Sequence, residues 1–207
     1  MTEHHALVPV SDHTFGLFDD YQIPIDTADW SNGLIVTMDI GASIYTGIDR
    51  GTVRVTVDLR TTAPADIDTG PWDDIVEASI HAPHGNLRVH LLEYGPHSSA
   101  PDLPLLSTAG AGTYRLRAHT RGRDEQFDAV STEPGEDYLL SIWPAAAQPD
   151  LIIRATDRCG YGLRLSSLTT PIKDPHRQPP GHQELQTRNA ELRAALLPQA
   201  PDQPPTA

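Results

Sequence analysis

The chain has 207 residues, enough for one domain of about 150 residues with tails. Its 28 acidic residues outnumber 15 basic residues, and the formal charge of −13 argues against nucleic-acid binding because phosphate backbones would be repelled. The 19 prolines and 15 glycines exclude a long helical bundle or coiled coil.

The charge is concentrated in residues 1–150, which hold 23 acidic and 8 basic residues, whereas residues 151–207 carry +2. Apolar runs fall well short of the roughly 20 residues of a membrane-spanning helix, and the first residues lack the pattern of a signal peptide. The single cysteine, Cys159, excludes an internal disulfide and a thiolate zinc cage. We therefore expect a cytoplasmic protein with no membrane contact and no cofactor.

Short strands are predicted from residue 15 onward, after a loose lead-in over residues 1–13. Residues 15–18 form a short strand, and in residues 34–40 Leu34, Val36, Met38 and Ile40 alternate with Ile35, Thr37 and Asp39, which indicates a strand with one drier face. The clearest pattern covers residues 51–61, where Val53, Val55, Val57 and Leu59 alternate with Arg54, Thr56, Asp58 and Arg60. Strict alternation rich in β-branched residues predicts a strand with one face in the core.

Further strands are predicted at 72–82 and 87–91, joined as a hairpin by the turn at 83–86. Leu105 and Leu106 begin another strand or lead into one, and residues 114–121, 138–143 and 151–155 continue the series. Leu163 and Leu165 are candidates for a last edge strand.

About eight short strands with regular turns predict an all-β fold. The expected architecture is an antiparallel β-sandwich, of jelly-roll or Greek-key type, over residues 14–168. Residues 169–207 form a Pro-rich tail, with a linker followed by one short helix at about 182–197.

Four aspartates, Asp19, Asp20, Asp26 and Asp29, lie within eleven residues and form the candidate partner-binding site. Such a density of carboxylates suits a basic partner or calcium, or it is a solvated acidic loop. The calcium-loop pattern of alternating acids, a central glycine and a final glutamate is absent.

A second candidate is the group His81, His84, His90 and Glu93 on the predicted hairpin, which could bind a metal or be exposed polar residues. The row Arg115, Arg117, His119 and Arg121 could hold an anion, or could pair across strands with acids such as Asp58 or Glu77.

The tryptophans and the cysteine are further candidates. Trp30, Trp72 and Trp143 could stack a sugar or close the core. Cys159 follows Arg158, which could lower its pKa, but no histidine lies within ten residues in the sequence. Serine-nucleophile and phosphate-binding glycine motifs are also missing.

The order of several motifs resembles the competence-J family of small bacterial proteins, which are inhibitors of a DNA-entry nuclease. The resemblance lies in Phe15-x-Leu-Phe18-Asp19, the step Asp29-Trp30-Ser31, the strand from Gly51 to Arg60, the strand from Trp72 to Ile80, and Gly112-Thr-Tyr114-Arg-Leu116. It covers residues 15–143 and implies an all-β fold. The resemblance assigns an inhibitory role to no residue of this sequence.

The sequence thus predicts a non-enzymatic, protein-binding β-sandwich, such as an inhibitor or immunity factor of a basic nuclease or toxin. The alternative is a metal-dependent or sugar-binding jelly-roll protein that uses His81, His84 and His90 or the tryptophans.

Overall fold

The computed structural model describes residues 2–20, 22–90 and 103–169. Eleven strands, one 3₁₀ turn and one α-helix follow one another in the described residues: β1 (Thr2–Val10), β2 (Thr14–Asp19), η1 (Ile25–Thr27), β3 (Ile35–Thr37), β4 (Ala42–Tyr45), β5 (Arg50–Leu59), β6 (Asp74–Ala82), β7 (Leu87–His90), β8 (Gly112–Arg121), β9 (Val130–Ser131), β10 (Asp137–Pro144), β11 (Leu151–Ala155) and α1 (Arg158–Thr169).

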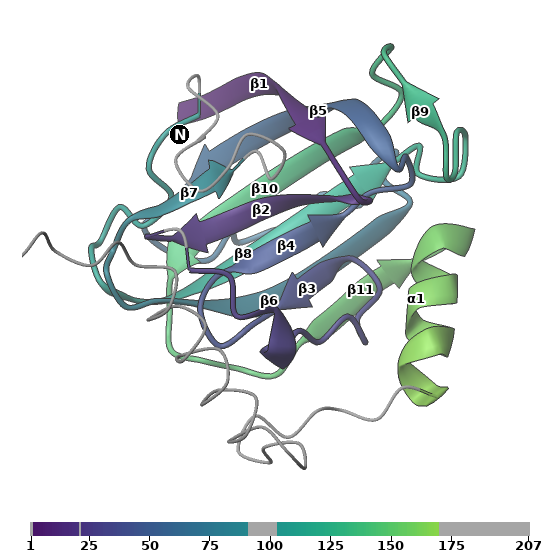
Figure 1. Ribbon diagram of the computed structural model, residues 1–207. Coiled ribbons are helices and arrows are strands. Elements are labelled where there is room, and N and C mark those ends of the chain that lie inside the picture. The colour runs from purple at the N-terminus through teal and green to yellow at the C-terminus, as the bar shows by residue number, and fades with distance from the viewer. Residues whose placement is uncertain (1, 21, 91–102, 170–207) are drawn as a thin grey trace, which may run out of the picture. The chain divides into compact units, whose positions relative to one another are not determined.

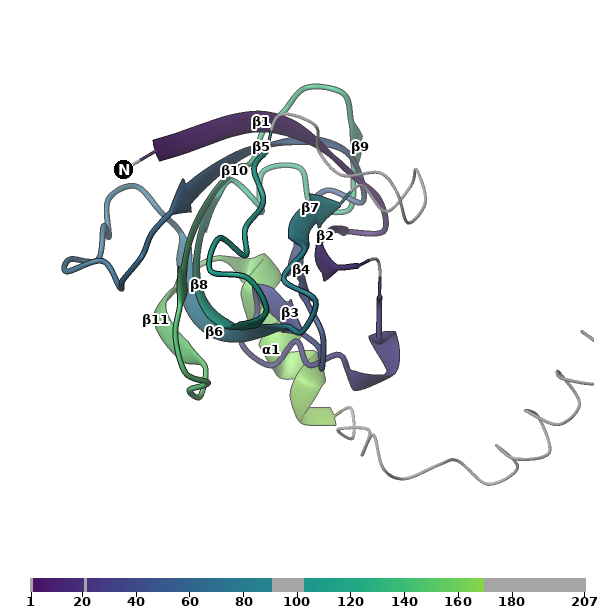
Figure 2. The same cartoon turned by 90° about the vertical axis from the view of Figure 1, so that its left-hand side faces the viewer.

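The strands form two sheets packed face to face (Figure 1). The larger sheet has the order β1-β5-β10-β8-β6-β11, with β9 beside β5, and the smaller has the order β3-β4-β2-β7. The larger sheet curves around the smaller one, and α1 lies at one end of the sandwich (Figure 2). The predicted all-β sandwich is confirmed.

Alternating side chains build the core between the sheets. Val53, Val55 and Val57 of β5 are buried at 1% exposure or less, as the pattern of that strand predicts. Opposite them, Phe15 of β2 meets Tyr138 of β10 edge to face, with ring centroids 5.4 Å apart. The interdigitating inner faces of the two sheets thus stabilise the fold by removing apolar surface from water.

The expected purely antiparallel sheet is wrong at two pairings, because β5 runs parallel to both β10 and β9. The predicted hairpin at 72–91 is also wrong. Strand β6 pairs with β8 and β11, while β7 pairs with β2 in the other sheet. Asp19 accepts hydrogen bonds from the backbone N–H groups of His84 (2.6 Å) and Asn86 (2.5 Å), so the intervening turn carries the chain from one sheet to the other.

The N-terminal segment expected as a loose lead-in contains β1, which pairs with β5 along its whole length. Val8 and Val10 of β1 are buried in the core. Strands β4 and β9 were not anticipated, and Leu105 and Leu106 lie in no strand.

The predicted last edge strand at Leu163 and Leu165 is wrong, because residues 158–169 form α1. The linker and helix predicted at 169–207 lie outside the described residues, apart from Thr169, which ends α1. In the described part of the chain, no helix is long and apolar enough to span a membrane.

Candidate functional site

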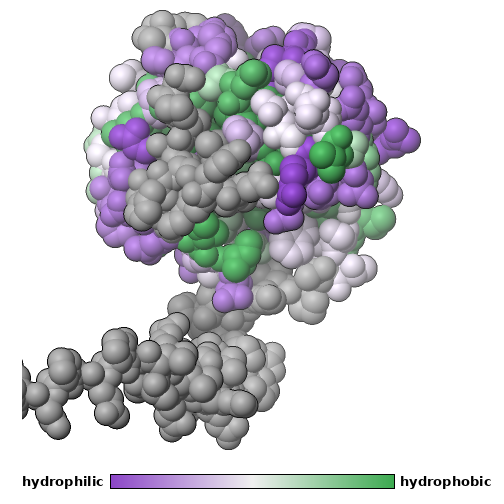
Figure 3. Space-filling model, turned by 45° about the horizontal axis from the view of Figure 1, so that its top comes forward, coloured by the Kyte–Doolittle hydropathy of each residue, from purple (hydrophilic) through white to green (hydrophobic). Residues whose placement is uncertain are grey.

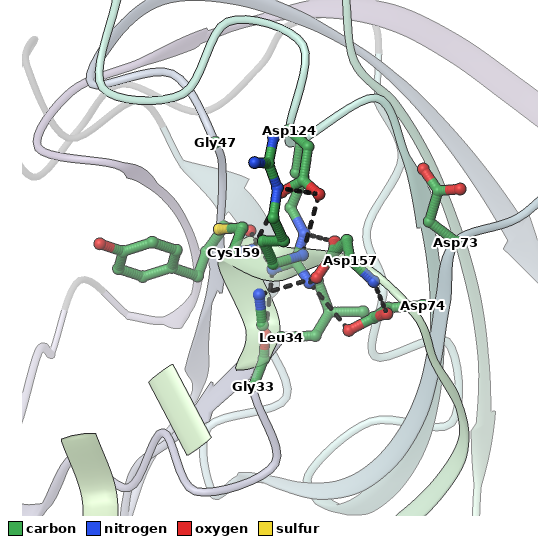
Figure 4. Close-up of polar contacts among 12 residues, drawn as sticks. Gly33, Leu34, Gly47, Asp73, Asp74, Asp124, Asp157 and Cys159 are labelled. Carbon is green, nitrogen blue, oxygen red and sulfur yellow. Dashed lines mark hydrogen bonds and ion pairs between the residues drawn. The ribbon is translucent and has the colours of Figure 1, made fainter. Parts of the chain in front are cut away.

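A fully buried arginine, Arg123, holds together the end of the sandwich where α1 begins. It follows β8 in the chain, and its side chain is 0% exposed. Its Nε and Nη2 donate to Asp157 (2.6 and 3.0 Å), and Nη2 also donates to Asp74 (3.1 Å). Its Nη1 donates to the carbonyls of Gly33 (3.0 Å) and Tyr45 (3.3 Å). Figure 4 shows Asp74, Asp157 and Gly33 around this cluster.

These contacts keep Arg123 charged. Burial lowers the pKa of the Arg123 guanidinium, but the surrounding acidic groups, Asp157 foremost, together outweigh burial and raise this pKa above its usual value. Arg164 of α1 adds a second cation, with Nη1 3.2 Å from Asp74. The network therefore joins both sheets, the loop after β8 and α1.

Two carboxylates cap the N-terminus of α1. Asp157 precedes the helix and accepts a hydrogen bond from the Gly160 N–H (2.7 Å). Asp124 comes from the loop after β8 and accepts the N–H groups of Arg158 (2.9 Å) and Cys159 (3.0 Å). Partial burial of Asp124 raises its pKa, but these hydrogen bonds outweigh that effect and lower it. The first amides of the helix are therefore occupied.

A pocket of about 470 Å³ lies beside this capped helix end. Its wall combines two aromatic rings, one aliphatic side chain, a carboxylate and a guanidinium. The lining residues are Tyr45, Asp124, Phe127, Arg158, Cys159, Gly162 and Leu163. Phe127 is 56% exposed, so part of its ring is available to a ligand.

His13 supports the aromatic wall of the pocket. Its ring stacks on Tyr45 with centroids 5.3 Å apart and planes within 5°, and it lies 5.9 Å from the ring of Phe127. Its Nε2 is 3.2 Å from Asp128 and 3.9 Å from Asp49. His13 and Asp128 both have positive φ angles, 57° and 59°, which non-glycine residues rarely adopt. The carboxylates thus hold the histidine against the wall.

Exposed acidic residues outnumber exposed basic residues on the described part of the chain. Eleven acidic residues are exposed in the described segments, against four arginines. Three other arginines, Arg115, Arg117 and Arg123, are buried at 6% exposure or less, and six acidic residues are buried too: Asp19, Asp58, Asp74, Glu77, Glu136 and Asp157. Figure 3 shows one face of the molecule, on which hydrophilic residues predominate and hydrophobic residues form separate patches.

The four predicted partner-binding aspartates have different environments. Asp19 is 0% exposed, and its carboxylate holds the turn between β6 and β7, so it cannot contact a partner directly. Asp20 is exposed and accepts a hydrogen bond from the Asn86 amide (3.1 Å). Asp26 is exposed on η1, and Asp29 is half-buried and accepts the Ser31 N–H (2.9 Å). Partner binding by the other three stays a prediction.

The histidines of the metal hypothesis do not converge. His81 is exposed on β6, His84 lies in the next turn 3.3 Å from Asp19, and His90 is buried against Phe18 in the other sheet. Glu93 lies outside the described residues. Within residues 2–20, 22–90 and 103–169, no group of three or more potential ligands could hold a metal ion.

Arg115 and Arg117 of the basic row on β8 form buried ion pairs on the outer face of the larger sheet, whereas Arg121 is exposed and pairs with Asp137 (2.8 Å). Glu77 of β6 pairs with Arg115 (3.2 Å) and Arg117 (2.6 Å), as the cross-strand alternative predicts. Backbone carbonyls of a loop, including that of Gln148 (3.0 Å), accept further hydrogen bonds from the Arg115 guanidinium. Asp58, the other predicted partner, pairs with Arg60 instead.

The tryptophans and the cysteine do not form the sites considered for them. Trp143 is 5% exposed beneath Arg117, Trp72 packs on His119, and Trp30 donates to Ser166 of α1 (3.3 Å), so they share no open platform. Burial raises the pKa of Cys159 to about 12, which disfavours the nucleophilic thiolate.

Sequence reasoning missed the Arg123 network and the pocket. Arg123 lies 34 residues from Asp157 and 90 from Gly33, so no local pattern joins them. Phe127 offered a weak signal, since it is an aromatic residue in the otherwise polar segment 121–128.

No protein-family model matches the sequence, and the comparison with curated proteins finds no match. Two solved structures are similar. One is described as crocagin biosynthetic gene J, with a TM-score of 0.44 and 20% identity, covering 70% of this chain and 100% of that one. The other is ComJ, inhibitor of the DNA degrading activity of NucA, from Bacillus subtilis, with a TM-score of 0.40 and 13% identity, covering 70% of this chain and 96% of that one.

Proposed function

We propose that this chain is a non-enzymatic binding protein that recognises a basic protein through its acidic surface. The excess of exposed acidic side chains carries the proposal, because eleven acidic residues but four arginines are exposed in the described segments. Two of the exposed arginines, Arg54 and Arg121, both pair with Asp137, which reduces the positive potential that they present. The exposed side chains of the described residues therefore carry a net negative charge.

Such a surface attracts a basic partner over a distance of about one Debye length, roughly 10 Å at 0.1 M salt. It accelerates association and rejects acidic competitors, while short-range contacts set the lifetime of the complex. A nuclease or toxin with a basic substrate-binding face is a partner of the required chemistry, so the proposed role is that of an inhibitor or immunity factor. ComJ is described as an inhibitor of this class; the proposal itself rests on the charge distribution.

Groups that could serve an enzyme are engaged elsewhere. Glu77 is held by two arginines, Asp74 and Asp157 are held by Arg123, and the Cys159 thiol is buried. Within the described residues, these engagements support a binding role in preference to the metal-dependent or sugar-binding alternative.

The test is capture of a partner from extract of the native cells with the tagged full-length chain, at low and at high salt. We expect a stoichiometric basic protein that is lost at high salt. Capture of no protein at low salt, or of a partner that high salt does not release, would overturn the proposal.

A pair of double variants then tests the predicted acidic segment. Asp20→Lys with Asp26→Lys should weaken capture, whereas Asp66→Lys with Glu133→Lys changes the net charge equally at other exposed positions and should weaken it less. Equal weakening by both variants would refute the assignment of the site to Asp20 and Asp26.

A further inference from the structure

We propose that the pocket between Tyr45, Phe127 and α1 receives an arginine or lysine side chain of the basic partner. The inference rests on the proposed function and assigns it a second contact point, away from the acidic segment at 19–29. Three observations carry it: the shape of the pocket, its aromatic wall and the charges around it.

The pocket is a cavity of about 470 Å³ that is open to solvent, large enough to accept one long side chain. Its apolar lining, Tyr45, Phe127 and Leu163, suits the methylene stem of arginine or lysine, which packs on apolar surface while its charged end stays near polar groups. Cys159 and Gly162 add small surfaces from α1, so the helix leaves the pocket open.

The aromatic wall suits a cation in particular. The faces of aromatic rings attract guanidinium and ammonium groups. Phe127 is 56% exposed, and Tyr45 is held in place by the stacked ring of His13. The aromatic groups are therefore positioned before a partner arrives, which reduces the entropy lost on binding.

The charges around the pocket also favour a cation. Asp124 lines it, and Glu125 and Asp128 lie on the same loop, both exposed. Asp49 lies 3.9 Å from His13, next to the aromatic wall. The one arginine of the lining, Arg158, is 3.5 Å from Asp124, so its charge is partly balanced.

An anion is disfavoured at the same place. Free amides at a helix N-terminus bind anions, but Asp124 and Asp157 already accept the N–H groups of Arg158, Cys159 and Gly160. These amides are therefore occupied, and of the two capping carboxylates Asp124 also lines the pocket.

The first test is an NMR titration of the full-length protein with three blocked amino acids: acetyl-arginine methylamide, acetyl-lysine methylamide and the neutral isostere acetyl-citrulline methylamide. We expect the two cations to shift the amide resonances of Phe127, Cys159 and Gly162, and citrulline to bind about two- to fivefold more weakly. Equal binding of citrulline, shifts confined to other regions, or no shifts would overturn the proposal.

Matched variants test whether the aromatic wall of the pocket contacts the bound arginine. Phe127→Ala should weaken arginine binding about two- to fivefold, and Asp128→Asn should also weaken it. Val130→Ala is the control, because Val130 is 73% exposed three residues farther along and does not line the pocket. If Val130→Ala weakens binding as much as Phe127→Ala does, the pocket is not the site.

Partner capture separates this inference from the proposed function. If the wild type and Phe127→Ala capture a salt-sensitive basic partner equally well, the pocket assignment fails and the proposed function stands. If arginine binds at the pocket but no basic partner is captured, the proposed function fails while the ligand chemistry of the pocket stands.

Discussion

Replacing Arg123 by methionine removes the charged centre of the fold while keeping most of its aliphatic volume. Arg123 donates five hydrogen bonds, three of them to the buried carboxylates of Asp74 and Asp157. Breaking a buried ion pair from one side costs about 3–5 kcal/mol, because the remaining charge is left uncompensated. Asp74 keeps its ion pair with Arg164, and Asp157 keeps its bond from Gly160, so we expect the lower end, about 3 kcal/mol.

The assay is equilibrium urea unfolding followed by tryptophan fluorescence. Arg54→Met is the control, since the side chain of Arg54 is 47% exposed and Asp137 retains Arg121 at 2.8 Å. An exposed pair contributes about 0–1 kcal/mol, so the control should unfold at nearly the wild-type urea concentration. A loss below about 1 kcal/mol for Arg123→Met, or a loss equal to that of the control, would refute the role of Arg123 as the organising ion-pair partner.

Three further changes test other parts of the structure. Asp19→Asn should cost about 2 kcal/mol in thermal or urea unfolding, because a buried charged acceptor of two backbone N–H groups is lost; a loss no larger than that of the exposed Asp20→Asn would contradict this. The thiol of Cys159, buried and with a pKa of about 12, should react with a thiol reagent far more slowly in the native protein than in urea, and equal rates would show that the site is open. Burial lowers the pKa of His119 in the folded protein. The neutral, buried imidazole therefore contributes its full stabilisation above about pH 6.5, the pKa in the unfolded chain, and this stabilisation is lost as the pH falls through the lower pKa of the folded state. His119→Phe should therefore flatten the decline of stability with acidification, and an unchanged decline would refute the assignment.

Local pattern was sufficient for strands whose two faces differ in polarity. In β5 the valines at 53, 55 and 57 are buried as predicted, because each residue's face follows from the period of two. The pairing of Arg115 and Arg117 with Glu77 was one of the predicted alternatives, since neighbouring strands place such residues opposite one another.

Pairing between strands required information that the local pattern does not hold. The turn after β6 resembles a hairpin turn in sequence, but Asp19, more than 60 residues earlier, binds its backbone and helps place β7 beside β2. Likewise, α1 contains Gly160 and Gly162, which disfavour a helix, and forms with capping carboxylates from Asp157 and the distant Asp124.

In the candidate site too, some features followed from the sequence and others depended on tertiary contacts. Acidic character was evident from composition, and Asp20 and Asp26 are exposed as a partner surface requires. The burial of Asp19 and of three arginines depends on tertiary contacts, as does the pocket, whose lining comes from β4, the loop after β8 and α1.

The most direct test of partner recognition through the acidic surface is the dissociation constant of the captured complex as a function of salt concentration. Raising the salt shortens the Debye length from about 10 Å at 0.1 M to about 3 Å at 1 M, so exposed charges lose most of their attraction. We predict that the dissociation constant rises steeply over this range, mainly through slower association. A dissociation constant that stays constant over the same range would contradict electrostatic recognition of a basic partner.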